Sequence, residues 1–141
     1  ARLQPVLDSL KKMKDLGIWV EITTLLIPGL NDSSEELQDI AAFIADLGKE
    51  IPWHISRFHP QYKMLNRPVT PLDSLHRACE IGKKAGLKYV YCGNVPGDEG
   101  ENTYCANCSG LLIKRYGYRI LENALDGPAC SRCGHPLDGL F

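Results

Sequence analysis

The chain has 141 residues, a formal net charge of −1 and 44% hydrophobic residues, which is typical of a soluble globular protein with one domain and room for a small extra module. No apolar run reaches the ~18 residues of a membrane span, and the amino terminus lacks the basic and apolar regions of a signal peptide. We therefore expect a cytoplasmic protein that does not bind membranes. The chain starts within helical patterning, so we also expect a piece of a longer protein.

Three helices are predicted at residues 3–17, 33–48 and 70–86, where apolar side chains recur at helical spacing and a glycine closes each segment. Ser33, with Glu36 three residues later, forms a capping box at the start of the second helix. Thr70 is the expected N-cap of the third helix, with Pro71 in the first helical position. The first helix is expected to pack on the sheet.

Three strands are predicted at residues 18–27, 53–58 and 89–92. The first has apolar or threonine side chains at nearly every position, which predicts burial on both faces of a parallel sheet covered by helices. Its one charge, Glu21, shares a face with Thr23, because side chains two apart lie on the same side of a strand. We expect Glu21 to be paired, with Arg57 as a candidate partner, or functional.

The alternation of helices and strands predicts an α/β fold with a parallel sheet, either doubly wound or part of a barrel. Three strands are too few to close a barrel. In both architectures the chemistry gathers at the carboxyl ends of the strands, here residues 28–32, 59–67 and 92–97. These loops carry several polar side chains, which suit a ligand-binding rim, although turn and cap residues would give the same composition.

The amino-acid composition changes near Gly93. We therefore divide the chain into a body at residues 1–93, a glycine-rich and acidic linker at 94–102 and a terminal module at 103–141. Within the terminal module, residues 111–121 predict two short strands that turn near Gly117. The module carries four basic and three acidic residues. This balance is far from the basic surface that nucleic-acid binding requires.

Two Cys-x-x-Cys pairs flank the predicted hairpin: Cys105 with Cys108, and Cys130 with Cys133. This spacing is typical of a ribbon that holds one tetrahedral metal with four thiolates, and we expect zinc, with a single iron as the alternative. Two disulfides would suit neither a reducing compartment nor an α/β body. A shell closed by four sulfurs leaves no position for substrate, so the site is expected to be structural. Cys79 and Cys92 are expected to be buried thiols.

Five runs carry a resemblance to a known family: WVEITTLLIPGLNDSSEEL, WHISRFHPQYKM, YVYCGNVPG, YCANCSGLLIKRYGY and CSRCG. By these runs, which cover nearly the whole chain, the chain resembles the carboxyl-terminal part of radical S-adenosylmethionine enzymes. It is nearest to the AmmeMemoRadiSam-system enzymes, which are relatives of pyruvate formate-lyase activating enzymes. The resemblance implies a partial (β/α)6 barrel of the TIM-barrel type, and a [4Fe-4S] cluster that reduces S-adenosylmethionine to form a 5′-deoxyadenosyl radical. The substrate could be a protein or a small molecule.

The Cys-x-x-x-Cys-x-x-Cys triplet that holds the family's cluster does not occur in this sequence. We therefore interpret the chain as the last half of the barrel plus the ribbon, with the cluster and the cofactor belonging to the parent enzyme. The partner implied for this half is the missing amino-terminal half of the barrel. Without it the first strand has an unpaired edge, which predicts self-association.

By position, His59 matches the histidine that activating enzymes place near bound S-adenosylmethionine, and Glu21 and Thr23 lie on a strand that presents polar groups to the cofactor. The alternatives are that His59 is a loop residue before Pro60 and that Glu21 only makes an ion pair. The competing hypothesis for the whole chain is a non-catalytic zinc-ribbon module that binds a protein partner.

Overall fold

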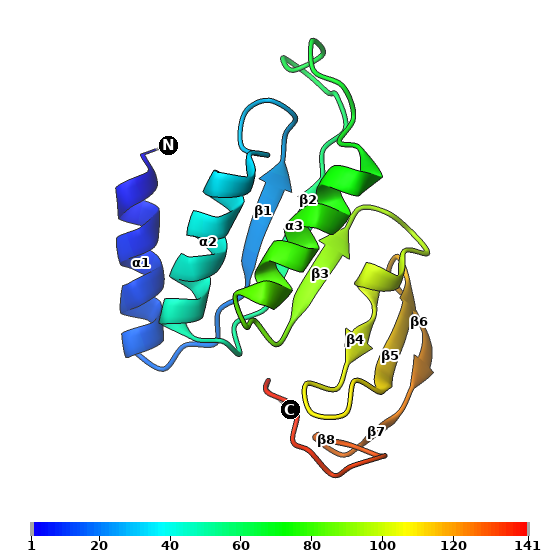
Figure 1. The fold of residues 1–141 in the computed structure, drawn as a ribbon. Coiled ribbons are helices and arrows are strands. Elements are labelled where there is room, and N and C mark those ends of the chain that lie inside the picture. The colour runs from blue at the N-terminus through cyan, green and yellow to red at the C-terminus, as the bar shows by residue number, and fades with distance from the viewer. Residues whose placement is uncertain (1, 141) are drawn as a thin grey trace.

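The computed structural model describes residues 2–140 as an α/β body followed by a smaller β module, the ribbon (residues 103–140) (Figure 1). Helices and strands alternate in the body, as the sequence predicts. The elements of the body are α1 (Leu3–Asp15), β1 (Ile22–Leu26), α2 (Ser34–Leu47), β2 (Trp53–Arg57), α3 (Leu72–Lys84) and β3 (Val90–Gly93).

The three strands of the body form a parallel sheet in the order β1-β2-β3. The register places Thr23 beside His54 and His54 beside Tyr91, so these three side chains share one face of the sheet. Among residues 2–140, no strand pairs with the outer edge of β1. The parallel sheet and its open edge agree with the sequence prediction, and self-association through that edge stays a prediction.

The core of the body lies between the sheet and helices α2 and α3, which cover the same face of the sheet (Figure 1). Leu26, Trp53 and Ile55 point from the strands into this layer and are fully buried. Helix α2 begins as predicted, because the Ser33 hydroxyl accepts a hydrogen bond from the Glu36 amide at 3.2 Å. Gly82 of α3 lies so close to the indole that a Cβ there would stand 2.9 Å from the Trp53 ring.

The expectation that the first strand is buried on both faces is wrong. β1 is shorter than predicted and its burial alternates: Leu26 is buried, whereas Thr23 is exposed and Leu25 is 45% exposed. The reason is that both crossover helices lie on one face of the sheet, so the face that carries Glu21, Thr23 and Leu25 has no helix over it (Figure 1).

Helix α1 begins at Leu3 as predicted and ends at Asp15, two residues before the predicted end, but it does not cover the sheet. It lies beside α2 at the margin of the body (Figure 1), and no side chain of α1 is fully buried in the described chain. The Lys11 ammonium lies 5.9 Å from the centre of the Phe43 ring of α2, and Lys14 forms an ion pair with Glu50. Val6 remains 48% exposed. The apolar stripe of α1 is therefore largely uncovered.

Thr70 does not cap α3 as predicted. The residue at the cap position is Pro71, and the Thr70 side chain is fully buried under the carboxyl ends of two strands. Its hydroxyl donates to the Leu26 carbonyl and accepts from the Phe58 amide at 3.0 Å. Thr70 therefore joins the loop before α3 to β1 and β2. Leu72, the first residue of α3, is 40% exposed.

The linker predicted at residues 94–102 contains a short 3-10 helix, η1, that leads into the ribbon. The predicted hairpin is present, and its turn contains Gly117 with a positive φ of 56°. The elements after β3 are η1 (Glu99–Glu101), β4 (Thr103–Tyr104), β5 (Leu111–Tyr116), β6 (Arg119–Asn123), β7 (Leu125–Asp126) and β8 (Ala129–Cys130). None of the helices between residues 2 and 140 is both long enough and apolar enough to cross a bilayer.

Candidate metal centre

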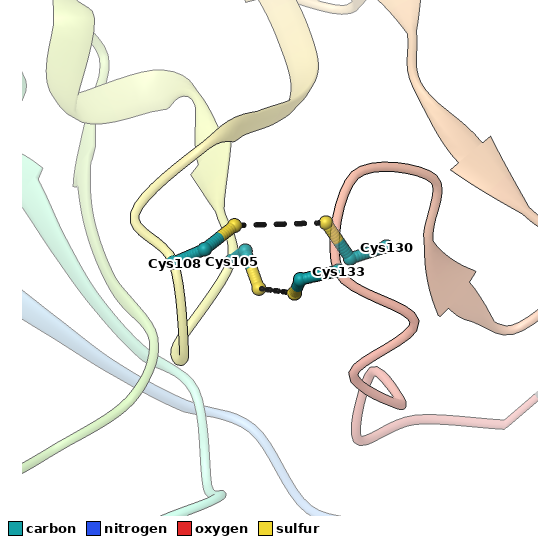
Figure 2. Close-up of side chains that lie close together, drawn as sticks. All are labelled: Cys105, Cys108, Cys130 and Cys133. Carbon is teal, nitrogen blue, oxygen red and sulfur yellow. Dashed lines mark hydrogen bonds between the residues drawn. The ribbon is translucent and has the colours of Figure 1, made fainter.

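The four ribbon cysteines converge on one point, as their spacing predicts (Figure 2). The Sγ atoms of Cys105 and Cys133 are 3.6 Å apart, those of Cys108 and Cys130 are 3.8 Å apart, and all four lie within 4.8 Å of one another. In a tetrahedral site with metal–sulfur bonds of about 2.3 Å, neighbouring sulfurs lie about 3.8 Å apart. The cluster therefore has the dimensions of a four-thiolate metal site.

The two Cys-x-x-Cys loops have matching backbone hydrogen bonds. The Ser109 amide donates to the Cys105 carbonyl at 2.9 Å, and the Gly134 amide donates to the Cys130 carbonyl at 2.8 Å. In the opposite direction, the Cys105 amide donates to the Gly110 carbonyl at 2.8 Å, and the Cys130 amide donates to the His135 carbonyl at 2.9 Å. The two loops are therefore two copies of one turn, and each presents two sulfurs to the same point.

Each loop needs a left-handed residue directly after its second cysteine. Gly134 has φ 69° and Ser109 has φ 56°, although serine adopts this region with strain. The turn then directs the next backbone amide at a sulfur: that of Gly110 at Cys108, and that of His135 at Cys133. In the first loop the left-handed position is Ser109, one residue before Gly110.

Two of the four thiols, Cys108 and Cys133, have pKa values that their neighbours shift. The His135 amide, the Asn107 side chain and nearby thiols lower the pKa of Cys133 to about 6. The Gly110 amide acts to lower the pKa of Cys108, but the surrounding thiols together raise it to about 11. Thiols this close cannot all ionise without a cation between them, because like charges repel. A bound metal ion would remove that conflict and hold all four as thiolates.

The cysteine cluster is supported by a small apolar core of its own. Cys105 and Cys130 are buried together with Leu112 of β5, and Leu125 and Leu137 pack against them. His135 contributes backbone groups to the second loop, and its side chain is not a member of the cluster. Four sulfurs complete a tetrahedron, so the arrangement suits a structural ion better than a catalytic one.

A chain of polar contacts crosses the helix-free face of the sheet. Glu21 Oε2 lies 2.7 Å from His54 Nε2, and the imidazole stacks on Tyr91 with ring centres 5.0 Å apart. The Tyr91 hydroxyl lies 3.0 Å from Thr103 Oγ1, which accepts from Arg115 at 2.7 Å. Burial raises the pKa of Tyr91 above its ordinary value of 10.0. The partner of Glu21 is thus His54 and not Arg57.

The ribbon and the carboxyl-terminal tail stand over part of this face and form with it an open pocket of about 950 Å³. Glu21, His54 and Tyr91 line it from the sheet, and Arg115 and Tyr118 line it from the ribbon. Sequence reasoning missed His54, Tyr91 and Arg115. One signal was present: polar residues occur at every second position of two neighbouring strands, at 21 and 23 and again at 54 and 56.

The structure does not bring the proposed cofactor residues together. Glu21 precedes the first residue of β1, and Thr23 lies two residues further along the same face. His59 is exposed and lies two residues beyond the end of β2. In the register of the sheet, Glu21 and His59 are about 20 Å apart along the strands. Only His59 occupies the end where parallel α/β folds gather their chemistry, and its role stays a prediction.

Cys79 and Cys92 are not separate buried thiols, because the structure joins them as a disulfide. Their Cα atoms are 6.8 Å apart, and the bond links α3 to β3. His76 and Asp98 lie beside Cys92, with His76 Nε2 2.7 Å from Asp98 Oδ2. Nothing in the spacing of these residues along the chain predicted this second cluster.

No family model matches the chain. The chain is 49% identical over 141 aligned residues to "Uncharacterized protein MJ0808" of Methanocaldococcus jannaschii. The match covers 98% of this chain and 42% of the relative. The chain therefore spans less than half the length of the curated relative it matches.

Proposed function

We propose that the ribbon holds one structural zinc ion through Cys105, Cys108, Cys130 and Cys133. The spacing of the four sulfurs carries this proposal, because two sulfur pairs lie 3.6 and 3.8 Å apart and all four sulfurs lie within 4.8 Å of one another, close to the dimensions of a four-thiolate tetrahedron. Iron fits the same geometry, and zinc is favoured because it has no redox chemistry and tolerates oxygen. The ion would hold together five short strands whose own apolar core is small.

We further propose that the body is the carboxyl-terminal half of a partial (β/α)6 barrel in a radical S-adenosylmethionine enzyme. The resemblance of the sequence runs is the starting point. Support comes from the parallel order β1-β2-β3, from helices on one face only, and from the open edge of β1. In a barrel the helix-free face would line the interior, where polar side chains such as Glu21 and His54 would be enclosed. The greater length of the relative is consistent with a further barrel half.

In this proposal the chain supplies part of the barrel wall and the rest of the enzyme supplies the catalytic cofactors. The [4Fe-4S] cluster and most of the S-adenosylmethionine site would belong to the amino-terminal half, where the family carries its cysteine triplet. When bound, the cluster reduces S-adenosylmethionine and so generates a 5′-deoxyadenosyl radical. His59, at the carboxyl end of β2, would contact the cofactor. The substrate class, protein or small molecule, is left open.

Activity assays on two lengths of protein test the enzyme proposal. The longer protein, reconstituted anaerobically with iron and sulfide, should release 5′-deoxyadenosine from S-adenosylmethionine, and the 141-residue chain treated in the same way should not. In the longer protein, His59→Asn should weaken cofactor binding, whereas His54→Asn should not, because His54 lies toward the amino end of β2. Release of 5′-deoxyadenosine by the short chain, or the reverse order of the two variants, would contradict the proposal.

A protein-binding role for the ribbon is the second candidate, and the exposed apolar side chains of one hairpin favour it. The β5–β6 hairpin exposes a group of large apolar side chains, all more than half exposed: Tyr116, Tyr118, Ile120 and Leu121. Exposed apolar patches of this kind often contact other proteins. If the ribbon is a binding module, replacing Ile120 by Lys should abolish capture of the partner and leave the metal content unchanged. Under the enzyme proposal the same variant should leave 5′-deoxyadenosine release unchanged.

A further inference from the structure

A second group of metal-ligand atoms lies apart from the ribbon, where α3, β3 and the linker meet. The side chains of His76 from α3, Cys92 from β3 and Asp98 from the linker present a nitrogen, a sulfur and an oxygen within 4.8 Å of one another. His76 Nε2 and Asp98 Oδ2 are 2.7 Å apart. The three ligands thus come from three separate segments and converge without help from the four-cysteine site.

The local backbone holds this group in place. Asp98 caps η1, because its Oδ1 accepts from the Gly100 amide at 2.7 Å, and this leaves Oδ2 facing the imidazole. The linker folds directly over the sulfur, since a Cβ at Gly100 would stand 2.7 Å from Cys92 Sγ. Cys92 is 2% exposed, and the Asp98 side chain is 13% exposed. Two of the three ligand side chains are therefore held against the body, and His76 closes the group from the solvent side.

The donor set selects a class of metal. A thiolate, an imidazole and a carboxylate together suit zinc and its borderline neighbours such as cobalt, and they do not suit magnesium or calcium, which require oxygen ligands. Zinc binds these groups at about 2.0 to 2.3 Å, so neighbouring ligand atoms lie about 3.3 to 3.8 Å apart. The His76–Asp98 hydrogen bond would open by roughly half an ångström to admit the ion. A small rotation of the exposed imidazole can provide that change.

We propose that His76, Cys92 and Asp98 form a second zinc-type site that exists only while the Cys79–Cys92 disulfide is reduced. The disulfide sulfur is not a thiolate and cannot act as an anionic ligand. A dithiol or phosphine reductant delivers two electrons to the disulfide, and two protons from water complete the Cys79 and Cys92 thiols. Metal binding then displaces the proton of the Cys92 thiol. The fourth position on the metal is left to water or to an external ligand.

The site would make the attachment of the linker to the body depend on whether Cys79 and Cys92 are oxidised or reduced. In the oxidised form, the bond from Cys79 to Cys92 ties α3 to β3 and leaves Asp98 held by His76 and the Gly100 amide. In the reduced form, the ion would tie α3 and β3 to the linker that enters β4. The proposal does not depend on the radical-enzyme proposal, because every ligand lies on the described chain.

Titration of the unmodified chain with cobalt, in its oxidised and reduced forms, tests this proposal. One equivalent of zinc per chain is added first, so that it fills the four-thiolate ribbon, which retains it against cobalt, and leaves the second site empty. Cobalt is then added anaerobically, and the thiolate-to-cobalt charge-transfer absorption is followed together with the amount of bound cobalt. Protein reduced with a phosphine should take up one cobalt per chain with this absorption, and oxidised protein should take up none. Cys79→Ser frees Cys92 permanently and should bind cobalt without reductant.

Variants of the exposed ligand and of a matched histidine complete the test. His76→Asn and Asp98→Asn should each lower cobalt affinity at least tenfold in the reduced protein. His59→Asn, which changes an exposed histidine outside the group, should not. Far-ultraviolet circular dichroism checks that each variant is folded. Reduced protein that takes up no cobalt beyond its zinc, a folded Cys79→Ser that takes up none, or unchanged affinity in His76→Asn would each overturn the proposal.

Discussion

Thr70 offers a sharp test of how the body is held together. The side chain is fully buried, and its hydroxyl joins the Leu26 carbonyl to the Phe58 amide. Thr70→Val keeps the shape and removes both hydrogen bonds. Leaving a buried donor or acceptor unpaired costs about 1 to 3 kcal/mol, so the loss of both should lower the free energy of unfolding by about 2 to 5 kcal/mol. Thr70→Ser keeps both bonds and should cost only about 1 kcal/mol for the lost methyl group.

Thr70→Asn separates this role from helix capping. If Thr70 capped α3, asparagine would serve as well or better, because it is among the best N-cap residues. In the fully buried position that the structure shows, the larger amide has no room and should destabilise the body by about as much as valine.

The assay is denaturant unfolding followed by Trp53 fluorescence in a Trp19→Phe background, because Trp53 is fully buried in the core of the body. For a unit of about 100 residues, each 1 kcal/mol corresponds to roughly 4 to 8 °C in the melting temperature. The expected order of stability is wild type, then Ser, then Val together with Asn. An asparagine variant as stable as wild type would refute the reasoning.

The remaining predictions concern the ribbon, the core and the tail. Cys108→Ser should abolish metal binding and unfold the ribbon, because structural zinc contributes roughly 10 to 16 kcal/mol to folding; the buried Trp53 fluorescence should persist, and its loss would argue against two folding modules. Gly82→Ala should destabilise the body by about 1 to 3 kcal/mol in the same assay, since the added Cβ meets the Trp53 ring, whereas a stabilised variant would show that α3 can move. Burial acts to raise the pKa of the Asp138 carboxyl, but hydrogen bonds from Lys88 and Tyr89 of the body hold that pKa below 3.8. The contact between the tail and the body should therefore be stable above pH 3.8 and be lost as the pH falls through the lowered pKa. Hydrogen exchange of the tail should show this loss, and Asp138→Asn should remove the pH dependence.

The local features that the sequence predicted correctly depend on short-range chemistry. Ser33 followed by Glu36 starts a helix because the hydroxyl reaches an amide three residues away. The paired cysteines form a cluster because each Cys-x-x-Cys turn fixes its own two sulfurs, so only the approach of two loops remains to be arranged. Such signals need no knowledge of the rest of the fold.

The features that the sequence predicted wrongly depend on contacts between segments that are distant in the chain. An apolar run cannot tell whether its two covering helices lie on one face of a sheet or on both, so the exposure of Leu25 was not predictable from the run alone. Glu21 pairs with His54 because of the register between β1 and β2, which the sequence does not state. The bond between Cys79 and Cys92 likewise depends on where α3 lies on β3.

We propose that one metal ion lies among the four sulfurs of Cys105, Cys108, Cys130 and Cys133. X-ray absorption at the metal edge of the purified protein, combined with elemental analysis, measures the number of ions and the atoms around each. In protein kept oxidised at Cys79 and Cys92, the account predicts one zinc or iron per chain, with four sulfurs at about 2.3 Å. A chain that holds no metal, or one whose ion has nitrogen or oxygen in place of any of the four sulfurs, would contradict it.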